Sequence, residues 1–152
     1  IGWLYKYNLV GLEAMIYGFE PSFNTNFGSS RISCNGSVLR GINMDDDRPL
    51  SYMPPDQVRV QYENNFFFLT NTFEAIFVSS QNRIGEFEVK TAGYNLFNYF
   101  GSYTISRNDR IHKIIFQLKN VFNQTYYNHL SKIKMIMPEA GRSLNINYRV
   151  YF

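Results

Sequence analysis

The chain has 152 residues, enough for about one domain, and 18% of them are aromatic, almost all phenylalanine or tyrosine. Its formal net charge of +3 is scattered along the sequence, so it lacks the clustered basic surface of a nucleic-acid-binding protein. No apolar run approaches the ~20 residues that a membrane helix needs. These properties argue against a helical membrane protein and against nucleic acid as a partner, and the single cysteine, Cys34, excludes an internal disulfide.

Alternation of apolar and polar residues predicts about eight strands along the chain. They are expected over residues 1–7, 12–23, 30–40, 57–63, 66–80, 94–105, 111–123 and 142–152. The connections between them alternate in length. Short turns are predicted near 26–28, 64–65 and 107–109, and longer loops over 41–55, 82–93 and 126–141.

The last strand shows the alternation most clearly. Leu144, Ile146, Tyr148, Val150 and Phe152 fall on one face, and polar residues occupy most positions between them. Because the pattern runs to a final aromatic residue, such an edge strand needs a pairing partner, which closure into a barrel supplies.

Abundant aromatic and amide side chains without a long apolar segment are typical of a transmembrane β-barrel, whose apolar residues occupy every second position. Alternation of short turns with long loops fits the same architecture, with the short turns periplasmic and the long loops extracellular. The predicted fold class is therefore all-β, a transmembrane antiparallel β-barrel in a bacterial outer membrane. A soluble β-sandwich, which uses the same alternation, is the alternative.

Several short motifs are spread over nearly the whole chain. They are Gly18-Phe19-Glu20, Pro49-Leu50, Met53-Pro54-Pro55, residues 93–98, residues 118–131, residues 138–142 and the terminal aromatic strand. Their order and spacing resemble the C-terminal end of TonB-dependent outer-membrane receptors, in the style of those of Bacteroidota.

The resemblance implies that residues 1–152 form about the last eight strands of a 22-strand barrel closed around a plug. The plug, the energy-coupling box and the earlier strands would lie outside this sequence. Since Ile1 follows neither an initiator methionine nor a signal peptide, we expect a mature chain or one incomplete at its N-terminus.

The function that the resemblance implies is active uptake of a scarce nutrient, such as a metal chelate or siderophore, energised from the inner membrane. The implied partners are outer-membrane lipid and lipopolysaccharide, the remainder of the barrel and its plug, and the barrel assembly machinery. An inner-membrane energy-coupling protein would be reached through the missing N-terminal part.

A small stand-alone barrel of about eight strands, acting as an anchor, adhesin or structural subunit of a membrane complex, is the alternative function. A reading frame that extends upstream through a plug favours the receptor, whereas a signal peptide directly before Ile1 favours the small barrel. In the small barrel the strand near Trp3 would pair with residues 145–151. Enzymatic activity is not expected, because neither His112 nor His129 has a sequence context that indicates a catalytic partner.

Charged residues at alternate strand positions are candidates for the lumen face, where they line the wall or grip the plug. These residues are Glu20, Arg31, Arg59, Glu74, Lys113, Lys119 and Arg149. The opposite face is expected to contact lipid through Phe73, Phe116, Leu118, Leu144, Ile146 and Val150.

The long loops contain two groups of metal-binding residue types. Asp45, Asp46 and Asp47 offer carboxylate oxygens, and His129 precedes Met135, Met137 and Glu139 in the last long loop. We interpret the first group as a solvated loop tip and His129 as a structural residue, so no metal or cofactor is predicted. Asp45, Asp46, Asp47 and His129 remain the extracellular-loop candidates.

The C-terminal strand is also a candidate assembly signal. Tyr148, Val150 and Phe152 present an alternating apolar face that resembles the segment recognised by the assembly machinery of outer-membrane barrels. Recognition by strand addition would use the main chain for affinity and the alternate side chains for selectivity.

Overall fold

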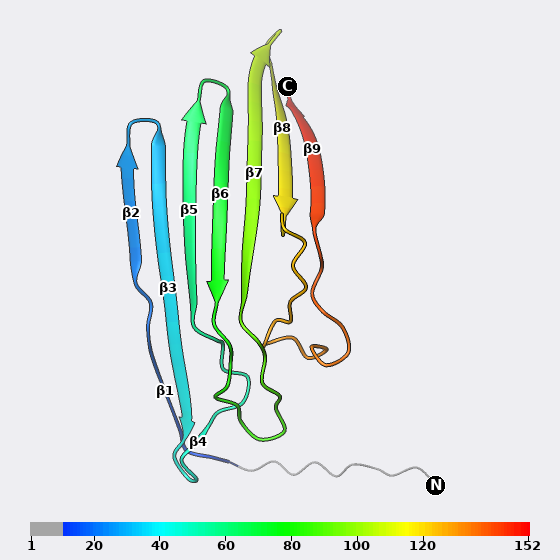
Figure 1. Cartoon of the computed structure of the whole chain (residues 1–152). Coiled ribbons are helices and arrows are strands. Elements are labelled where there is room, and N and C mark those ends of the chain that lie inside the picture. Colours follow the sequence, from blue (N-terminus) through cyan, green and yellow to red (C-terminus); the bar gives the residue numbers. More distant parts are fainter. Residues whose placement is uncertain (1–10) are drawn as a thin grey trace.

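The computed structural model describes residues 11–152, which form a single antiparallel β-sheet (Figure 1). The strands are β1 (Ala14–Phe19), β2 (Ser22–Phe27), β3 (Ser30–Asn43), β4 (Arg48–Pro49), β5 (Gln57–Phe66), β6 (Leu69–Val78), β7 (Tyr94–Arg107), β8 (Arg110–Lys119) and β9 (Ser143–Tyr151). Across these residues the structure contains no helix long and apolar enough to cross a membrane. The prediction of an all-β antiparallel architecture is confirmed.

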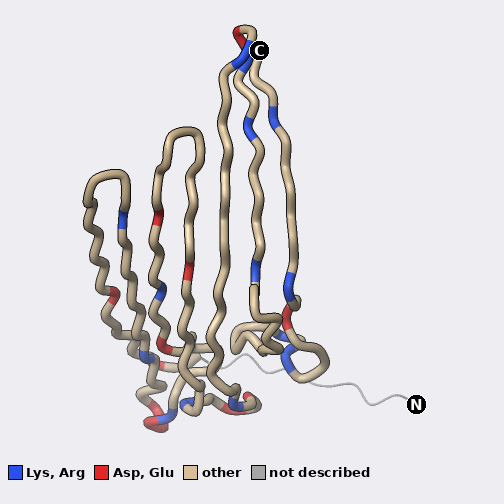
Figure 2. The backbone as a smooth tube through the Cα atoms, turned by 45° about the horizontal axis from the view of Figure 1, so that its top comes forward, with Lys and Arg blue, Asp and Glu red and all other residues tan. Residues whose placement is uncertain are grey.

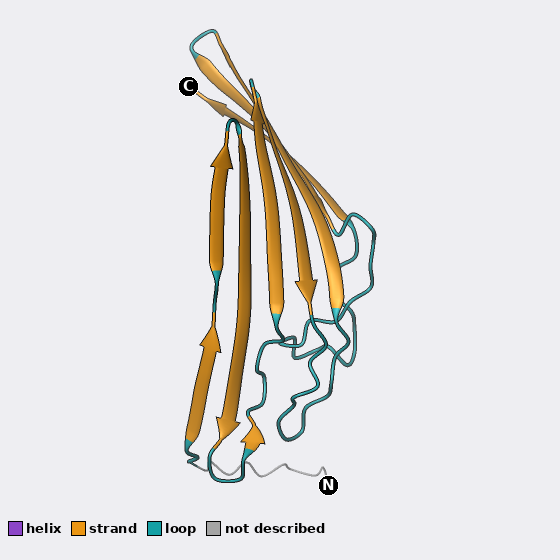
Figure 3. Ribbon diagram, turned by 60° about the vertical axis from the view of Figure 1, so that its left-hand side comes forward, coloured by secondary structure: helices purple, strands orange, loops and turns teal. Residues whose placement is uncertain are grey.

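The strands lie side by side in the order β1-β3-β5-β6-β7-β8-β9, with β2 and β4 also paired to β3. Within residues 11–152, β1 and β2 occupy one edge of the sheet and β9 the other, and these edges do not pair with each other. Figure 3 shows that the sheet twists, so that β9 runs obliquely to β3. The predicted strand near Trp3 lies outside the described residues.

One face of the sheet is apolar and exposed. The register aligns Tyr62, Phe73, Tyr99, Leu118 and Leu144 in a single row across β5 to β9. Phe73 is 52% exposed and Leu144 is 55% exposed, and no second sheet of the described chain covers them. A soluble β-sandwich would bury this row against a partner sheet, so the structure gives no support to that alternative.

The two ends of the sheet differ in the length of their connections. Two-residue turns join β2 to β3, β5 to β6 and β7 to β8 at one end, where the C-terminus also lies (Figure 1). The β3–β4 turn and the long loops over 79–93 and 120–142 gather at the opposite end. The Asn108-Asp109 turn has φ values of 53° and 57°, as expected of a type I′ hairpin turn.

The single strand predicted over residues 12–23 is wrong, because the structure breaks it at Glu20 and Pro21. Proline has no N–H to donate to the ladder, and the Pro21 carbonyl instead accepts the backbone N–H of Gly36 at 2.9 Å. β1 and β2 therefore pair with separate halves of β3. The prediction of Gly18 to Glu20 within a strand holds only to Phe19.

The predicted turn at Asn64-Asn65 is also wrong, since both residues are paired within the β5–β6 ladder. The turn lies instead at Phe67 and Phe68, with Phe67 at a φ of 50° and 88% exposed. The predicted strand over 111–123 is too long: β8 ends at Lys119, and Asn120 turns the chain with a φ of 51°. Asn120 then closes this turn, because its side chain bonds to both backbone groups of Gln124.

Candidate functional site

The polar face of the sheet centres on the buried carboxylate of Glu74, which is 7% exposed. Its Oε2 accepts a hydrogen bond from Gln61 Nε2 at 2.8 Å, and its Oε1 accepts one from Asn98 Nδ2 at 2.7 Å. Arg59 Nη1 lies 3.6 Å from the same carboxylate. These neighbours on β5 and β7 satisfy a charge that would otherwise be costly to bury.

The structure places the predicted lumen candidates on this polar face. Strand pairing puts Arg31, Arg59, Glu74, Lys113, Lys119 and Arg149 on it, and Glu20 joins them beside the β1–β2 break. The residues predicted to contact lipid lie on the opposite, apolar face. That the polar face borders a lumen remains a prediction.

The polar face is hollowed between β2, β3 and β5. Two hollows lie side by side and share Asn35, with Glu20, Gln57 and Arg59 beside one and Arg31 and Glu63 beside the other. Their walls carry amide, hydroxyl and charged groups, so this part of the face can hydrogen-bond to a polar solute or to another polypeptide.

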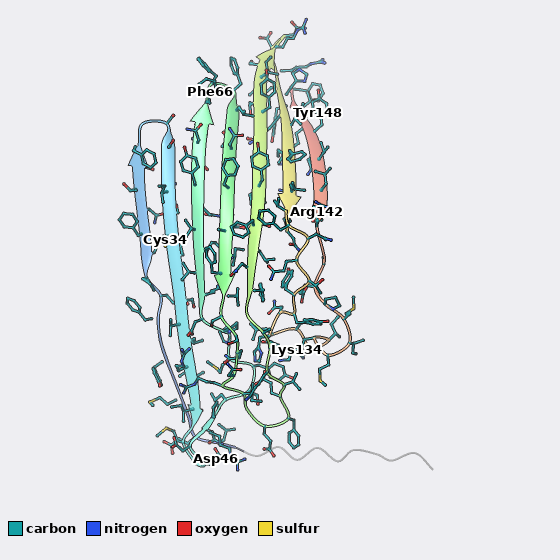
Figure 4. All side chains as sticks on the ribbon, in the orientation of Figure 1. Cys34, Asp46, Phe66, Lys134, Arg142 and Tyr148 are labelled. Atoms are coloured by element: carbon teal, nitrogen blue, oxygen red, sulfur yellow. The ribbon has the colours of Figure 1, made fainter. Side chains whose placement is uncertain are left out.

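A second site joins the loops at the other end of the sheet. It consists of Tyr52, Gly85, Glu88, Thr91, His129 and Lys134, which we call the loop network. Figure 4 labels Lys134 among the loops below β7 and β8. The network brings together three segments that are separate in the sequence, residues 50–56, 79–93 and 120–142.

The carboxylate of Glu88 is the centre of the loop network and is only 2% exposed. It accepts the backbone N–H groups of Tyr52, at 3.2 Å, and of Gly85, at 3.3 Å. The ammonium group of Lys134 lies 3.3 Å from Oε1 and also donates to the backbone carbonyl of His129 at 2.7 Å. One carboxylate therefore holds groups from all three loop segments.

His129 completes the network and is 1% exposed. Its Nδ1 lies 3.0 Å from the hydroxyl of Thr91, and its Nε2 lies 2.8 Å from Oε1 of Glu88. Because Lys134 and Thr91 both offer protons on the Nδ1 side, the ring proton belongs on Nε2, facing Glu88. Although Nε2 is buried and close to this carboxylate, it makes no well-directed hydrogen bond.

The pKa values of His129 and Glu88 are both shifted. Burial lowers the pKa of His129 below its ordinary 6.5, and Lys134 adds to this, outweighing the opposite effect of Glu88. Burial alone would raise the pKa of Glu88, but the N–H groups of Tyr52 and Gly85, with Lys134, bring it below 4.5. At neutral pH the network thus contains a neutral imidazole between a carboxylate and an ammonium group.

These directions predict that acid loosens the loops. Below about pH 6.5, His129 binds a proton more readily in the open loops than in the closed network, which destabilises the closed state. Below about pH 4.5, Glu88 does the same. Hydrogen exchange over residues 79–93 and 120–142, corrected for intrinsic rates, should show lower protection at pH 5 than at pH 7. Protection that is independent of pH would contradict this assignment.

The other loop candidates lie apart from the network. Asp45, Asp46 and Asp47 occupy the exposed β3–β4 turn, where Asp46 pairs with Arg48 at 3.5 Å, and Figure 4 shows Asp46 far from Lys134. Met135 and Met137 are exposed, whereas His129 is buried. No three His, Cys, Asp or Glu side chains of residues 11–152 gather as a metal site would require.

The candidate assembly residues lie on the apolar face of β9. Tyr148 pairs with Ile114 and Val150 with His112, and the hydroxyl of Tyr148 lies 2.7 Å from His112 Nδ1. Phe152 follows the strand and is 92% exposed. The face is therefore continuous to the end of the described chain.

Sequence reasoning missed Glu88, Lys134 and Thr91. Glu88 stands between Phe87 and Val89, and Lys134 between Ile133 and Met135. Phe87 is 98% exposed and Met135 is 76% exposed, so the charged residues point inward and their apolar neighbours outward. A lone charge between large apolar residues in a loop was the one signal present.

An open antiparallel sheet with one exposed apolar face, one polar face and all long loops at one end is the fold of a segment of β-barrel wall. No protein-family model matches the sequence, and no curated protein matches it. Among solved structures the chain is similar to one described as "Copper transporter OprC", with a TM-score of 0.81 and 25% sequence identity.

That similarity covers 88% of this chain and 23% of the transporter, so the chain spans about a quarter of the transporter's length. It agrees with the barrel-wall fold.

Proposed function

We propose that this chain is the C-terminal part of a TonB-dependent receptor in a bacterial outer membrane. The receptor takes up a scarce nutrient, such as a metal chelate or siderophore, with energy supplied from the inner membrane. The observation that carries the proposal is the uncovered apolar face, because lipid is the solvent that makes its exposure favourable.

The open edges of the sheet agree with a longer barrel. Each unpaired N–H or C=O at an edge costs several kcal/mol in hydrocarbon, so β1 and β9 need neighbouring strands there. The remainder of the barrel supplies them, and the plug covers the polar face near Glu74, Arg59 and the hollows beside Asn35. The inner-membrane energy-coupling protein acts through the N-terminal part.

Uptake by intact cells tests the transport function. Cells that make the complete protein are compared with cells that lack it, with radioactive copper and a radioactive ferric siderophore as separate probes. We expect the parent cells to accumulate more of at least one probe, and a protonophore to abolish the difference. Equal accumulation of both probes with and without the protein would overturn the proposal.

The barrel assembly machinery is a further expected partner, and Phe152 tests it. Deleting Phe152 should reduce insertion in cells more than it reduces stability, because one terminal aromatic contributes about 1.5–3 kcal/mol at most. Insertion is measured as heat-modifiable folded protein in membranes, and stability as refolding of the same variant in detergent. Equal losses in both would mean that Phe152 acts through packing.

A further inference from the structure

The apolar face changes character over the last residues of β7, β8 and β9, at the short-turn end. Strand pairing arranges nine residues there in three rows. The rows are Tyr103, Ile114 and Tyr148; then Ile105, His112 and Val150; then Arg107, Arg110 and Phe152. Toward the tip of the hairpin the face thus passes from apolar and aromatic groups to guanidinium groups, and Figure 2 shows the basic residues gathered there beside the C-terminus.

The outermost row holds two like charges directly opposite each other. Arg107 pairs with Arg110 across the hairpin, and both are exposed. The Arg110 guanidinium lies 4.8 Å above the ring of Phe152. No carboxylate of residues 11–152 is within 4.0 Å of either guanidinium, although Asp109 lies in the turn between them. Opposed like charges are unfavourable across a hairpin unless an anion sits between them.

We propose that Arg107 and Arg110 bind the phosphate of an anionic phospholipid in the inner leaflet of the outer membrane. The inference rests on the proposed membrane location, which sets the short-turn end toward the periplasm. A guanidinium fork matches phosphate in geometry and charge, and the Arg110 guanidinium stacks over the ring of Phe152.

The spacing of the rows fits this ligand. Ile114 and Arg110 are four residues apart, which is ~13 Å along a strand and ~10 Å in depth for a strand tilted by ~40°. With Ile114 in the hydrocarbon, this difference in depth places Arg110 in the headgroup layer, which extends ~5–7 Å beyond the hydrocarbon core on each side. Tyr103 and Tyr148, in the row nearest the apolar band, are the residue type that favours the membrane interface.

The test uses the complete protein, purified and placed in nanodiscs with phosphatidylglycerol or with phosphatidylcholine, and counts lipids retained in native mass spectrometry. The wild type should retain phosphatidylglycerol preferentially. The R107Q/R110Q double variant should lose preference by about fivefold per arginine. R107K/R110K, which keeps both charges, should retain most of it.

K90Q/K132Q is the matched control, because it removes two exposed charges from the loops at the opposite end. It should leave the preference unchanged. Equal retention of both lipids by the wild type, or an unchanged preference in R107Q/R110Q, would overturn the inference while leaving the membrane location intact. Failure of the wild type to enter membranes at all, judged by heat modifiability, would overturn the membrane location itself and the inference with it.

Discussion

Replacing Glu88 with alanine is expected to open the long loops at a cost of about 3–5 kcal/mol to their closed state. The substitution leaves the Lys134 ammonium group buried without its carboxylate and removes the acceptor for the N–H groups of Tyr52 and Gly85. The measurement is hydrogen exchange over residues 79–93 and 120–142, where protection should fall by about two to four orders of magnitude for such a cost.

Glu86→Ala is the matched control for this experiment. Glu86 is two residues away, is exposed, and contributes only its backbone carbonyl to a contact with Ser51. Glu86→Ala should change the free energy of loop opening, measured by hydrogen exchange, by less than about 0.5 kcal/mol, as is usual for surface substitutions. If Glu88→Ala and Glu86→Ala behave alike, the loop network does not hold the loops together.

The second large effect concerns the apolar face. Ile146 is 64% exposed and pairs with Phe116. Replacing it with arginine should lower the free energy of unfolding by roughly 2–4 kcal/mol if this position lies near the bilayer midplane. In water the same substitution at an exposed position would be nearly neutral. The free energy of unfolding is measured by denaturant titration of the complete protein in lipid vesicles.

Asn145→Arg provides the comparison within the same strand. Asn145 pairs with Gln117 on the polar face, so an arginine there meets water or polar groups and should cost far less. Equal destabilisation by both substitutions would mean that the two faces of β9 do not differ in their surroundings. If Ile146→Arg leaves the free energy of unfolding unchanged, the physical basis of the membrane assignment is removed.

Much of the sheet could be predicted from the sequence because its two faces differ at every second residue. In β9 the alternation from Leu144 to Phe152 fixes which residues share a face, and pairing with β8 extends the pattern. The fold class follows from the same signal. β4 has only two residues, Arg48 and Pro49, and no periodicity could have revealed it.

The turn between β5 and β6 shows where local residue preferences fail. Asn64 and Asn65 are common in turns, but their side chains here bond across the sheet, with Asn64 donating to Ser30 and Asn65 accepting from Thr70. Longer pairing moves the turn to Phe67, although a bulky residue disfavours a positive φ. The pairing of ten residues of β5 with ten of β6 outweighs the preference of Asn64 and Asn65 for a turn.

The loop network could not be predicted, because its members are brought together from distant parts of the chain. Glu88 is 46 residues from Lys134 and 36 from Tyr52, and no local pattern encodes those contacts. The sequence pointed to His129 as a structural residue, and its burial fits that interpretation. Its partners became identifiable only from the folded loops.

The β3–β4 turn at Asp45, Asp46 and Asp47 has a practical consequence for tagging the protein. It projects at the same end as the loop network but shares none of its contacts, and its side chains bond only to nearby residues and to the backbone of Glu13. If the long-loop end faces outward, as the proposed function requires, an epitope inserted there would be displayed outside the cell without disturbing the ties between the long loops. Antibody binding to living cells would then report the orientation of the protein directly.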